Sequence, residues 1–238
     1  MYRKTEYRFP GAIEIEEYHS ARYGAPGEKR QPKRKPTAEQ MAAANQRARE
    51  KTCRRKLRAN FREDDYLITL TYRKEERPPD MEQAKKDLQK LLRKLRDGYR
   101  KRGEALKWIA NIECGTRGAW HVHLVTNRVR DGDALISRLW QFGRISLQLI
   151  YEQGKCHKLA RYMTKTPRTD PRLREAHYMS SRNLPVPKPK KKVVRWKSFR
   201  QISPPKGWYL EKETYFEGVN PVTGYRCRSY TFLRCRRD

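Results

Sequence analysis

The sequence is short of acidic residues, long apolar runs and paired cysteines. No apolar run approaches the ~18 residues that a membrane-spanning helix requires, and the opening segment MYRKTEYRFPG lacks the apolar stretch of a secretory signal. The five cysteines are odd in number and form no CxxC pair, which argues against a disulfide framework and a zinc ribbon. We therefore expect reduced thiols, a cytoplasmic protein and no membrane partner.

The shortage of acids leaves a large excess of basic residues. Lysine and arginine number 57 against 27 acids, which gives a formal net charge of +30 at pH 7. A chain with this charge repels itself unless a polyanion neutralises it. A nucleic acid is therefore the expected partner.

Composition divides the chain into four segments. Residues 1–60 form a basic N-terminal arm and helix: residues 1–36 mix Gly, Pro and charge and are predicted to be irregular, and Thr37-Ala-Glu-Gln is a capping box that begins a helix. Residues 61–187 form the compact domain. Residues 188–206 are a basic proline-rich linker expected to run extended, and residues 207–238 are predicted to form a C-terminal β-hairpin extension with a turn near Asn220.

The compact domain alternates strand and helix patterns in a fixed order. Strands are predicted over residues 66–72, 106–114, 119–127 and 144–150. Helices are predicted after Asp80, over residues 131–142, and over residues 154–166 before Pro167. The order βαββαβ indicates an α+β fold of the ferredoxin-like split βαβ type, an antiparallel sheet with helices on one face.

Two histidines on the third predicted strand give the sharpest chemical signal. His121 and His123 share one face, because side chains two apart on a strand point the same way. If the second and third strands pair so that opposed residue numbers sum to 234, Glu113 lies opposite His121. This set suits a divalent metal, Mn²⁺ or Mg²⁺, although a strand His-x-His alone is more often surface polarity. Trp120, Val122 and Leu124 then face a helix, and the histidines lie on the exposed side.

Tyr162, on the last predicted helix, is the candidate nucleophile. Tyr162 and Lys165 are three residues apart and share a helix face, with Lys158 one turn earlier. A tyrosine with a pKa near 10 is a poor nucleophile unless a metal or a nearby ammonium stabilises the phenolate. Without such neighbours, a helical tyrosine is usually a packing residue with a hydrated hydroxyl.

Several segments together resemble the HUH endonucleases, and in particular the rolling-circle replication initiator (Rep) proteins of phages, plasmids and mobile elements. ECGTRGAWHVHLV resembles the histidine-hydrophobic-histidine motif, YLITLTY the strand motif before it, and KLARYMTK the catalytic Y-x-x-K helix. RLWQFGRISLQLI is similar to the family's last strand, and REAHYMSSRNLPVP to a serine- and arginine-rich stretch that follows it. The resemblance covers roughly residues 60–187.

The resemblance implies a reaction and a role for each matching residue. His121, His123 and Glu113 would bind the metal, Tyr162 would attack single-stranded or hairpin origin DNA, and Lys165 would contact the phosphate. The products would be a 5′-phosphotyrosine link and a free 3′-OH, and the strands could later be rejoined. The implied setting is a bacterial cytoplasm, with a host helicase as a further candidate partner.

The sequence departs from some members of this family because its helix offers a single tyrosine. A second strand transfer would then require another protomer or another nucleophile. Candidate DNA contacts are the basic residues of this helix and of the segments that follow it: Lys158, Arg161, Arg182, Lys190, Lys191, Lys192 and Arg195. Trp196, Trp208 and the tyrosines of the tail are candidates for stacking on unpaired bases or for ordinary packing. His157 and His177 receive no role.

Three other functions stay open at this point. A single-strand HUH transposase would share the active site and differ in substrate. A non-catalytic nucleic-acid-binding protein would display aromatic side chains on the sheet, where the third strand instead carries histidines. A metal-dependent phosphodiesterase would use an activated water in place of Tyr162.

Overall fold

The structure, a computed structural model, describes residues 1–19, 35–115, 118–150, 156–165, 178–220 and 223–235. Within these ranges the chain has four α-helices and two antiparallel β-sheets, so it is an α+β protein. It divides into two compact units, one of Met1–Arg49 with Val186–Asp238 and the other of Glu50–Pro185. Over the same ranges, every helix is too short or too polar to cross a membrane.

The unit Glu50–Pro185 is built on a five-stranded sheet with the order β6-β3-β5-β4-β7, in which every neighbouring pair is antiparallel. The four strands predicted from the sequence are all present. The strands are β3 (Tyr66–Thr71), β4 (Trp108–Cys114), β5 (Trp120–Thr126), β6 (Ile145–Leu149) and the two-residue β7 (Met179–Ser180).

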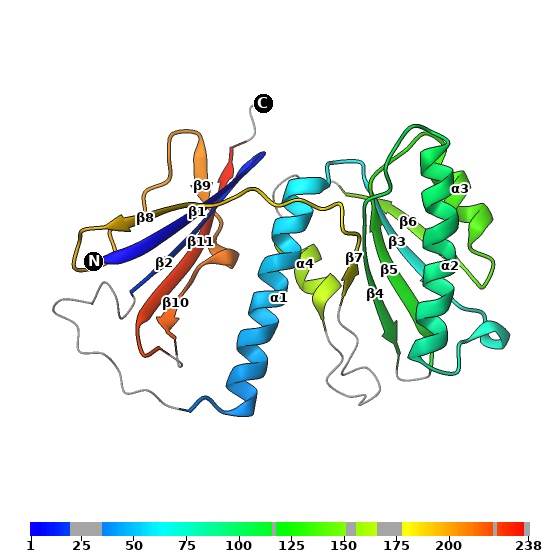
Figure 1. Cartoon of the computed structure of the whole chain (residues 1–238), viewed down its shortest axis with the longest axis horizontal. Coiled ribbons are helices and arrows are strands. Elements are labelled where there is room, and N and C mark those ends of the chain that lie inside the picture. Colours follow the sequence, from blue (N-terminus) through cyan, green and yellow to red (C-terminus); the bar gives the residue numbers. More distant parts are fainter. Residues whose placement is uncertain (20–34, 116–117, 151–155, 166–177, 221–222, 236–238) are drawn as a thin grey trace. The chain divides into compact units, whose positions relative to one another are not determined.

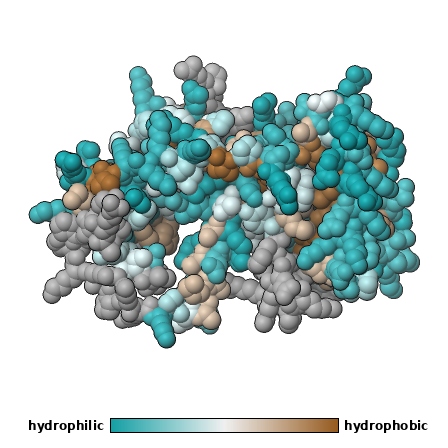
Figure 2. All heavy atoms as spheres, viewed as in Figure 1, coloured by the Kyte–Doolittle hydropathy of each residue, from teal (hydrophilic) through white to brown (hydrophobic). Residues whose placement is uncertain are grey.

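One face of this sheet is covered by α2 (Met81–Arg100) and α3 (Gly132–Leu139) (Figure 1). The predicted cap at Asp80 is confirmed, because its carboxylate accepts a 2.8 Å hydrogen bond from the Gln83 backbone N–H. Leucines at helical spacing on α2 pack into the main apolar core, while hydrophilic side chains cover the outer side of the helix (Figure 2). The buried α2 leucines are Leu88, Leu91, Leu92 and Leu95.

The opposite face carries a second, smaller core, so the prediction of helices on one face only is wrong. It is covered by α4 (His157–Thr164) and by the second half of α1 (Ala38–Asn60). Cys53 and Leu57 of α1 are fully buried there against Ile109 and Val125 of the sheet. The apolar residues of α1 are few among many arginines, which hid this buried stripe in the sequence.

The start of α1 agrees with the predicted capping box. The Thr37 hydroxyl accepts a 3.2 Å hydrogen bond from the Gln40 backbone N–H, and the Gln40 side chain accepts a 3.1 Å bond from the Thr37 backbone N–H. Both hydrogen bonds satisfy backbone donors that the first turn of a helix leaves unpaired.

The other unit contains the second sheet, ordered β10-β11-β2-β1-β8, with β9 also paired to β11. Its first hairpin, β1 (Tyr2–Phe9) and β2 (Ala12–Tyr18), shows that the prediction of an irregular arm over residues 1–36 is wrong for residues 2–18. The charged residues of β2 obscured the strand. Glu17, which is buried, is neutralised by Arg228 of β11 at 2.5 Å, a partner that local sequence cannot reveal.

The proline-rich segment 188–206 is extended, as predicted, but part of it is a sheet strand. β8 (Lys190–Val194) pairs with β1, and Lys190 lies opposite Glu6. The predicted C-terminal hairpin is confirmed in β10 (Phe216–Val219) and β11 (Arg226–Arg234), and the Gly224 backbone N–H closes its turn on the Asn220 carbonyl. β9 (Trp208–Leu210) adds a further strand to this sheet.

Candidate metal centre and tyrosine

The pairing of β4 with β5 places the predicted ligands side by side. Glu113 lies directly opposite His121 and Asn111 opposite His123, which is the predicted register. Side chains directly opposed in an antiparallel pair lie on the same face, so these four polar groups form one patch. The intervening residues of β5, Val122 among them, point into the core beneath α2.

Glu113, His121 and His123 form a compact group of potential metal ligands. The Oε2 atom of Glu113 lies 3.4 Å from Nε2 of His121 and 3.6 Å from Nε2 of His123. One ligand atom from each of the three residues lies within 4.8 Å of the others. This separation allows a single ion to contact all three atoms.

Hydrogen bonds fix the orientation of both imidazole rings. Nδ1 of His121 lies 3.1 Å from the carbonyl oxygen of Ala119, and since a carbonyl only accepts, Nδ1 carries the proton. Nδ1 of His123 lies 3.2 Å from the Thr69 hydroxyl on β3. These contacts leave the Nε2 atoms facing Glu113, and a second hydrogen bond of this kind is a common feature of metal-binding histidines.

The carboxylate of Glu113 is held from its other side. Its Oε1 atom accepts a 3.2 Å hydrogen bond from the Asn111 side chain, which leaves Oε2 for the histidines. Burial raises the pKa of Glu113, but hydrogen bonds and charge from the two histidines outweigh it and lower that pKa to about 2. The hydrogen bond to Glu113 raises the pKa of His121.

This set of ligand atoms fits a divalent metal ion. Two imidazole nitrogens and one carboxylate oxygen provide three ligands and leave further coordination positions for water or substrate oxygens. Glu113, His121 and His123 could therefore hold a metal ion, and the ligand types are compatible with more than one divalent metal.

Tyr162 lies against this cluster. It is on α4, and its hydroxyl oxygen is 2.8 Å from a ring nitrogen of His123, with ring centroids 4.5 Å apart. The side chain keeps 40% of its surface exposed. Partial burial, with the charge of Glu113 adding to it, raises the pKa of Tyr162. The phenol is therefore protonated and reachable from solvent beside the ligand cluster.

The contact with Tyr162 corrects one part of the sequence prediction. The histidines share a face, as expected, but His123 is only 3% exposed and does not lie on an open side of the sheet. The reason is α4, which packs over β4 and β5 through Ala160 and Met163 and brings Tyr162 above His123.

The basic residues near Tyr162 follow the same helix. Lys158 and Arg161 are exposed on α4, and Lys165 is exposed directly after its last residue, where the backbone turns extended. The helix ends at Thr164, earlier than predicted. Pro167 and His177 lie outside the described residues.

The remaining candidate DNA contacts are also exposed. Arg182 follows β7 in the same unit, whereas Lys190, Lys191, Lys192 and Arg195 belong to the other unit, on or just after β8. The four residues brought together at one place are thus Glu113, His121, His123 and Tyr162.

The sequence analysis missed two residues that position this site. Asn111 orients Glu113, and Thr69 contacts His123. The signal was available for Asn111, since it lies two residues before Glu113 on one strand and so shares its face. Thr69 required knowing that β3 pairs with β5, a contact between residues more than fifty positions apart.

Comparison with known proteins gives a match to the central part of this chain. No curated protein and no solved structure matches the sequence. The family model for replication-associated proteins of the ORF2 type matches residues 65–167, which is less than half of the chain but includes the whole ligand cluster, Tyr162 and Lys165. Over this segment the chain is similar to that family of replication-associated proteins, which is of the phage rolling-circle type.

Proposed function

We propose that the chain is an HUH-type replication initiator that nicks single-stranded origin DNA with Tyr162. The observation that carries the proposal is the contact between a half-exposed tyrosine and a Glu-His-His cluster, within the segment that matches the replication-associated family. A tyrosine next to a metal-ligand cluster is an arrangement suited to attack on a phosphodiester.

In the proposed reaction, the Tyr162 oxygen attacks the phosphorus of the scissile phosphodiester. A bond forms between the tyrosine oxygen and the 5′-phosphate, the bond to the 3′-oxygen breaks, the phenol loses its proton and the 3′-oxygen gains one. Reversal of this exchange with another 3′-OH rejoins strands. When bound at Glu113, His121 and His123, Mn²⁺ or Mg²⁺ supplies Lewis-acid polarisation of the phosphate.

The neighbouring residues have positioning roles in this proposal. His123 and α4 hold the Tyr162 hydroxyl at the cluster, while Asn111 and Thr69 keep Glu113 and His123 in place. Lys165 contacts the phosphate, since an ammonium near the reacting phosphate offsets its charge. Lys158, Arg161, Arg182, Lys190, Lys191, Lys192 and Arg195 bind the DNA backbone.

The fold and the domain organisation support the same proposal. The sheet order β6-β3-β5-β4 is the order that a ferredoxin-like split βαβ arrangement requires. We assign residues 61–187 as the endonuclease domain, with single-stranded or hairpin origin DNA as substrate and a host helicase as partner.

The experiment is incubation of the full-length protein with labelled single-stranded origin DNA and Mn²⁺, followed by a denaturing gel. Tyr162→Phe is compared with Tyr209→Phe, since Tyr209 is 39% exposed and lies in the other unit. We expect a protein-linked DNA band for the wild type and for Tyr209→Phe, dependent on metal and absent for Tyr162→Phe.

Other outcomes separate the alternative functions. Metal-dependent cleavage that survives Tyr162→Phe indicates a nuclease that uses water, and contradicts the covalent mechanism. Salt-sensitive binding without cleavage of any origin indicates a nucleic-acid-binding protein. A covalent product on the ends of a mobile element, with no origin cleaved, indicates a transposase.

A further inference from the structure

A hollow of about 860 Å³ lies at the β7 edge of the sheet in Glu50–Pro185. Its walls come from the end of α2, the segment from Gly103 to Leu106, the start of β4 and the segment from Ser180 to Asn183. This volume falls within the range of pockets that bind small molecules, about 300–1,000 Å³. We name it the Trp108 pocket after the aromatic residue in its lining.

The Trp108 pocket is separate from the metal cluster because its key side chain lies on the other face of the sheet. Trp108 packs with Ala110 and Ile112 against the core beneath α2. Glu113 alternates with these residues along β4 and faces α4 instead. None of the three potential metal ligands lines the pocket.

Three arginines give the pocket its charge. Arg96 and Arg182 form no ion pair or hydrogen bond within the part of the chain that the structure describes, although both line the pocket. Arg100 pairs with Asp97 at 3.2 Å, a contact exposed on α2. Against these three cations the pocket lining has one carboxylate, that of Glu104. The pocket is therefore suited to an anionic ligand with guanidinium-binding oxygens.

The wall opposite α2 is held in place by hydrogen bonds. The Trp108 backbone N–H donates to the Ser181 hydroxyl at 3.1 Å, and the Ser181 backbone N–H donates to the Trp108 carbonyl at 2.9 Å. The Asn183 side chain donates to the Leu106 carbonyl at 3.1 Å. Arg182 lies between these two anchored residues, so its backbone position is fixed beside Trp108.

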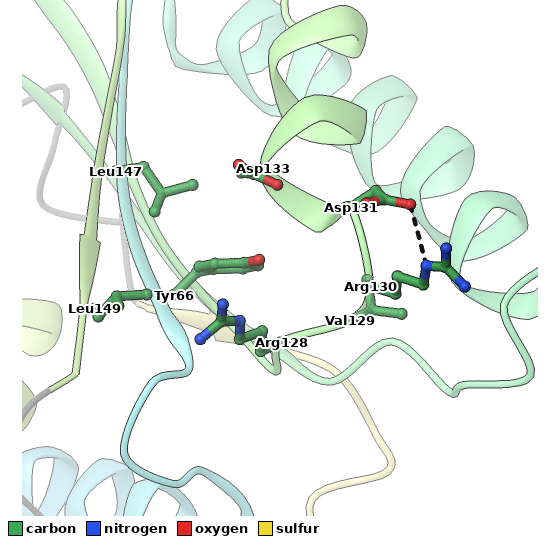
Figure 3. Close-up of a pocket in the computed structure, with 8 residues that line it drawn as sticks. All are labelled: Tyr66, Arg128, Val129, Arg130, Asp131, Asp133, Leu147 and Leu149. Carbon is green, nitrogen blue, oxygen red and sulfur yellow. Dashed lines mark ion pairs between the residues drawn. The ribbon is translucent and has the colours of Figure 1, made fainter.

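A second hollow in the same unit shows what distinguishes the first. It measures about 730 Å³, and its two arginines, Arg128 and Arg130, are balanced by two aspartates (Figure 3). Arg130 pairs with Asp131 at 3.7 Å, and Asp133 also lines the cavity. This hollow has no net charge to attract an anion, so its arginines provide a matched control.

We propose that the Trp108 pocket binds one nucleotide, with the base at Trp108 and the phosphate at the three arginines. An indole face stacks on any base, and guanidinium groups bind phosphate oxygens through two hydrogen bonds. The nucleotide is either free or an unpaired residue of a DNA strand, since both present the same base and phosphate. The site is independent of cleavage at Tyr162.

The test is a titration of the full-length protein in EDTA, where no metal-dependent cleavage takes place. The probes are dAMP, dTMP, inorganic phosphate and a fluorescent twelve-nucleotide oligo(dT), in about 0.3 M NaCl to suppress general charge attraction. Arg96→Gln with Arg182→Gln is compared with Arg128→Gln plus Arg130→Gln, which removes the same charge from the control hollow. Trp108→Leu and Trp108→Phe test the base contact, and circular dichroism checks that each variant is folded.

We expect the arginine pair and Trp108→Leu to weaken binding at least about tenfold, with the control pair within about twofold and Trp108→Phe close to wild type. An effect on dAMP or dTMP indicates that a free nucleotide suffices. The same effect confined to the oligonucleotide identifies the source as a DNA strand.

Two results would overturn the nucleotide site. Equal weakening by the two arginine pairs would show that only overall charge matters. Inorganic phosphate binding as tightly as dAMP, with no effect of Trp108→Leu, would show a simple anion site. Either result leaves the nicking proposal untouched, because no cleavage is measured.

Discussion

On β4 and β5, neighbouring residues point to opposite faces of one sheet, and the two faces bury different groups. Val122 and Leu124 are fully buried among apolar side chains beneath α2. His123, between them, is just as inaccessible but contacts Thr69 and Tyr162 through its ring nitrogens. The apolar face supplies stability, and the polar face supplies a cluster whose groups are costly to bury unless each has a partner.

This difference predicts that substitutions one residue apart separate function from stability. The largest effect is expected for His121→Ala with His123→Ala, since it removes two of three potential ligands. We expect Mn²⁺ binding measured by calorimetry to fall at least about a hundredfold, with protein-linked DNA lost as well. Unchanged Mn²⁺ affinity in this variant would contradict the metal site.

On the apolar face, Leu124→Ala is expected to act on stability alone. Its side chain is fully buried, so the loss should be about 2–5 kcal/mol in the free energy of unfolding, measured with urea. The residual folded protein should bind Mn²⁺ as the wild type does. If Leu124→Ala weakened Mn²⁺ binding while leaving stability intact, the assignment of the two faces would be wrong.

Within the polar face, Asn111→Ala tests the support of Glu113. Loss of its 3.2 Å hydrogen bond should weaken Mn²⁺ affinity about 10–100-fold, because a ligand that is not oriented binds metal less well. Gln148→Ala is the control, since Gln148 is exposed on β6 and lies outside the cluster. Equal affinities for the two variants would remove Asn111 from the site.

The smallest effect is expected at the cap of the helix that covers the apolar face. Asp80→Ala removes the acceptor for the Gln83 backbone N–H and should cost about 1 kcal/mol of stability. Asp80→Asn keeps a capping acceptor and should restore most of it. Thermal unfolding of both variants measures the difference, and an equal loss in both would mean that the cap contributes charge alone.

The two compact units differ in how far the sequence predicted them. In Glu50–Pro185, short-range patterns carry the fold: β4 and β5 are joined by a short turn, so the position of Glu113 opposite His121 followed from the hairpin register. The closeness of Tyr162 to His123 could be inferred only from the family resemblance. The burial of His123 could not be predicted, because it depends on how α4 packs.

The other unit depends on pairs that lie far apart in the sequence. β1 pairs with β8, and β2 with β11, so its strands are completed by residues from the other end of the chain. The buried ion pair of Glu17 with Arg228 looks in each strand like an exposed charge. Alternation of Ile13 and Ile15 with glutamates was the one local sign of β2.

The central claim, that Tyr162 attacks DNA beside the Glu113-His121-His123 cluster, is tested most directly by locating the covalent bond. The wild-type protein is reacted with single-stranded origin DNA and Mn²⁺, digested with protease and nuclease, and analysed by mass spectrometry. We predict a nucleotide adduct on Tyr162, absent when EDTA replaces Mn²⁺. An adduct on another residue, or cleaved DNA with no adduct on the protein, would contradict the account.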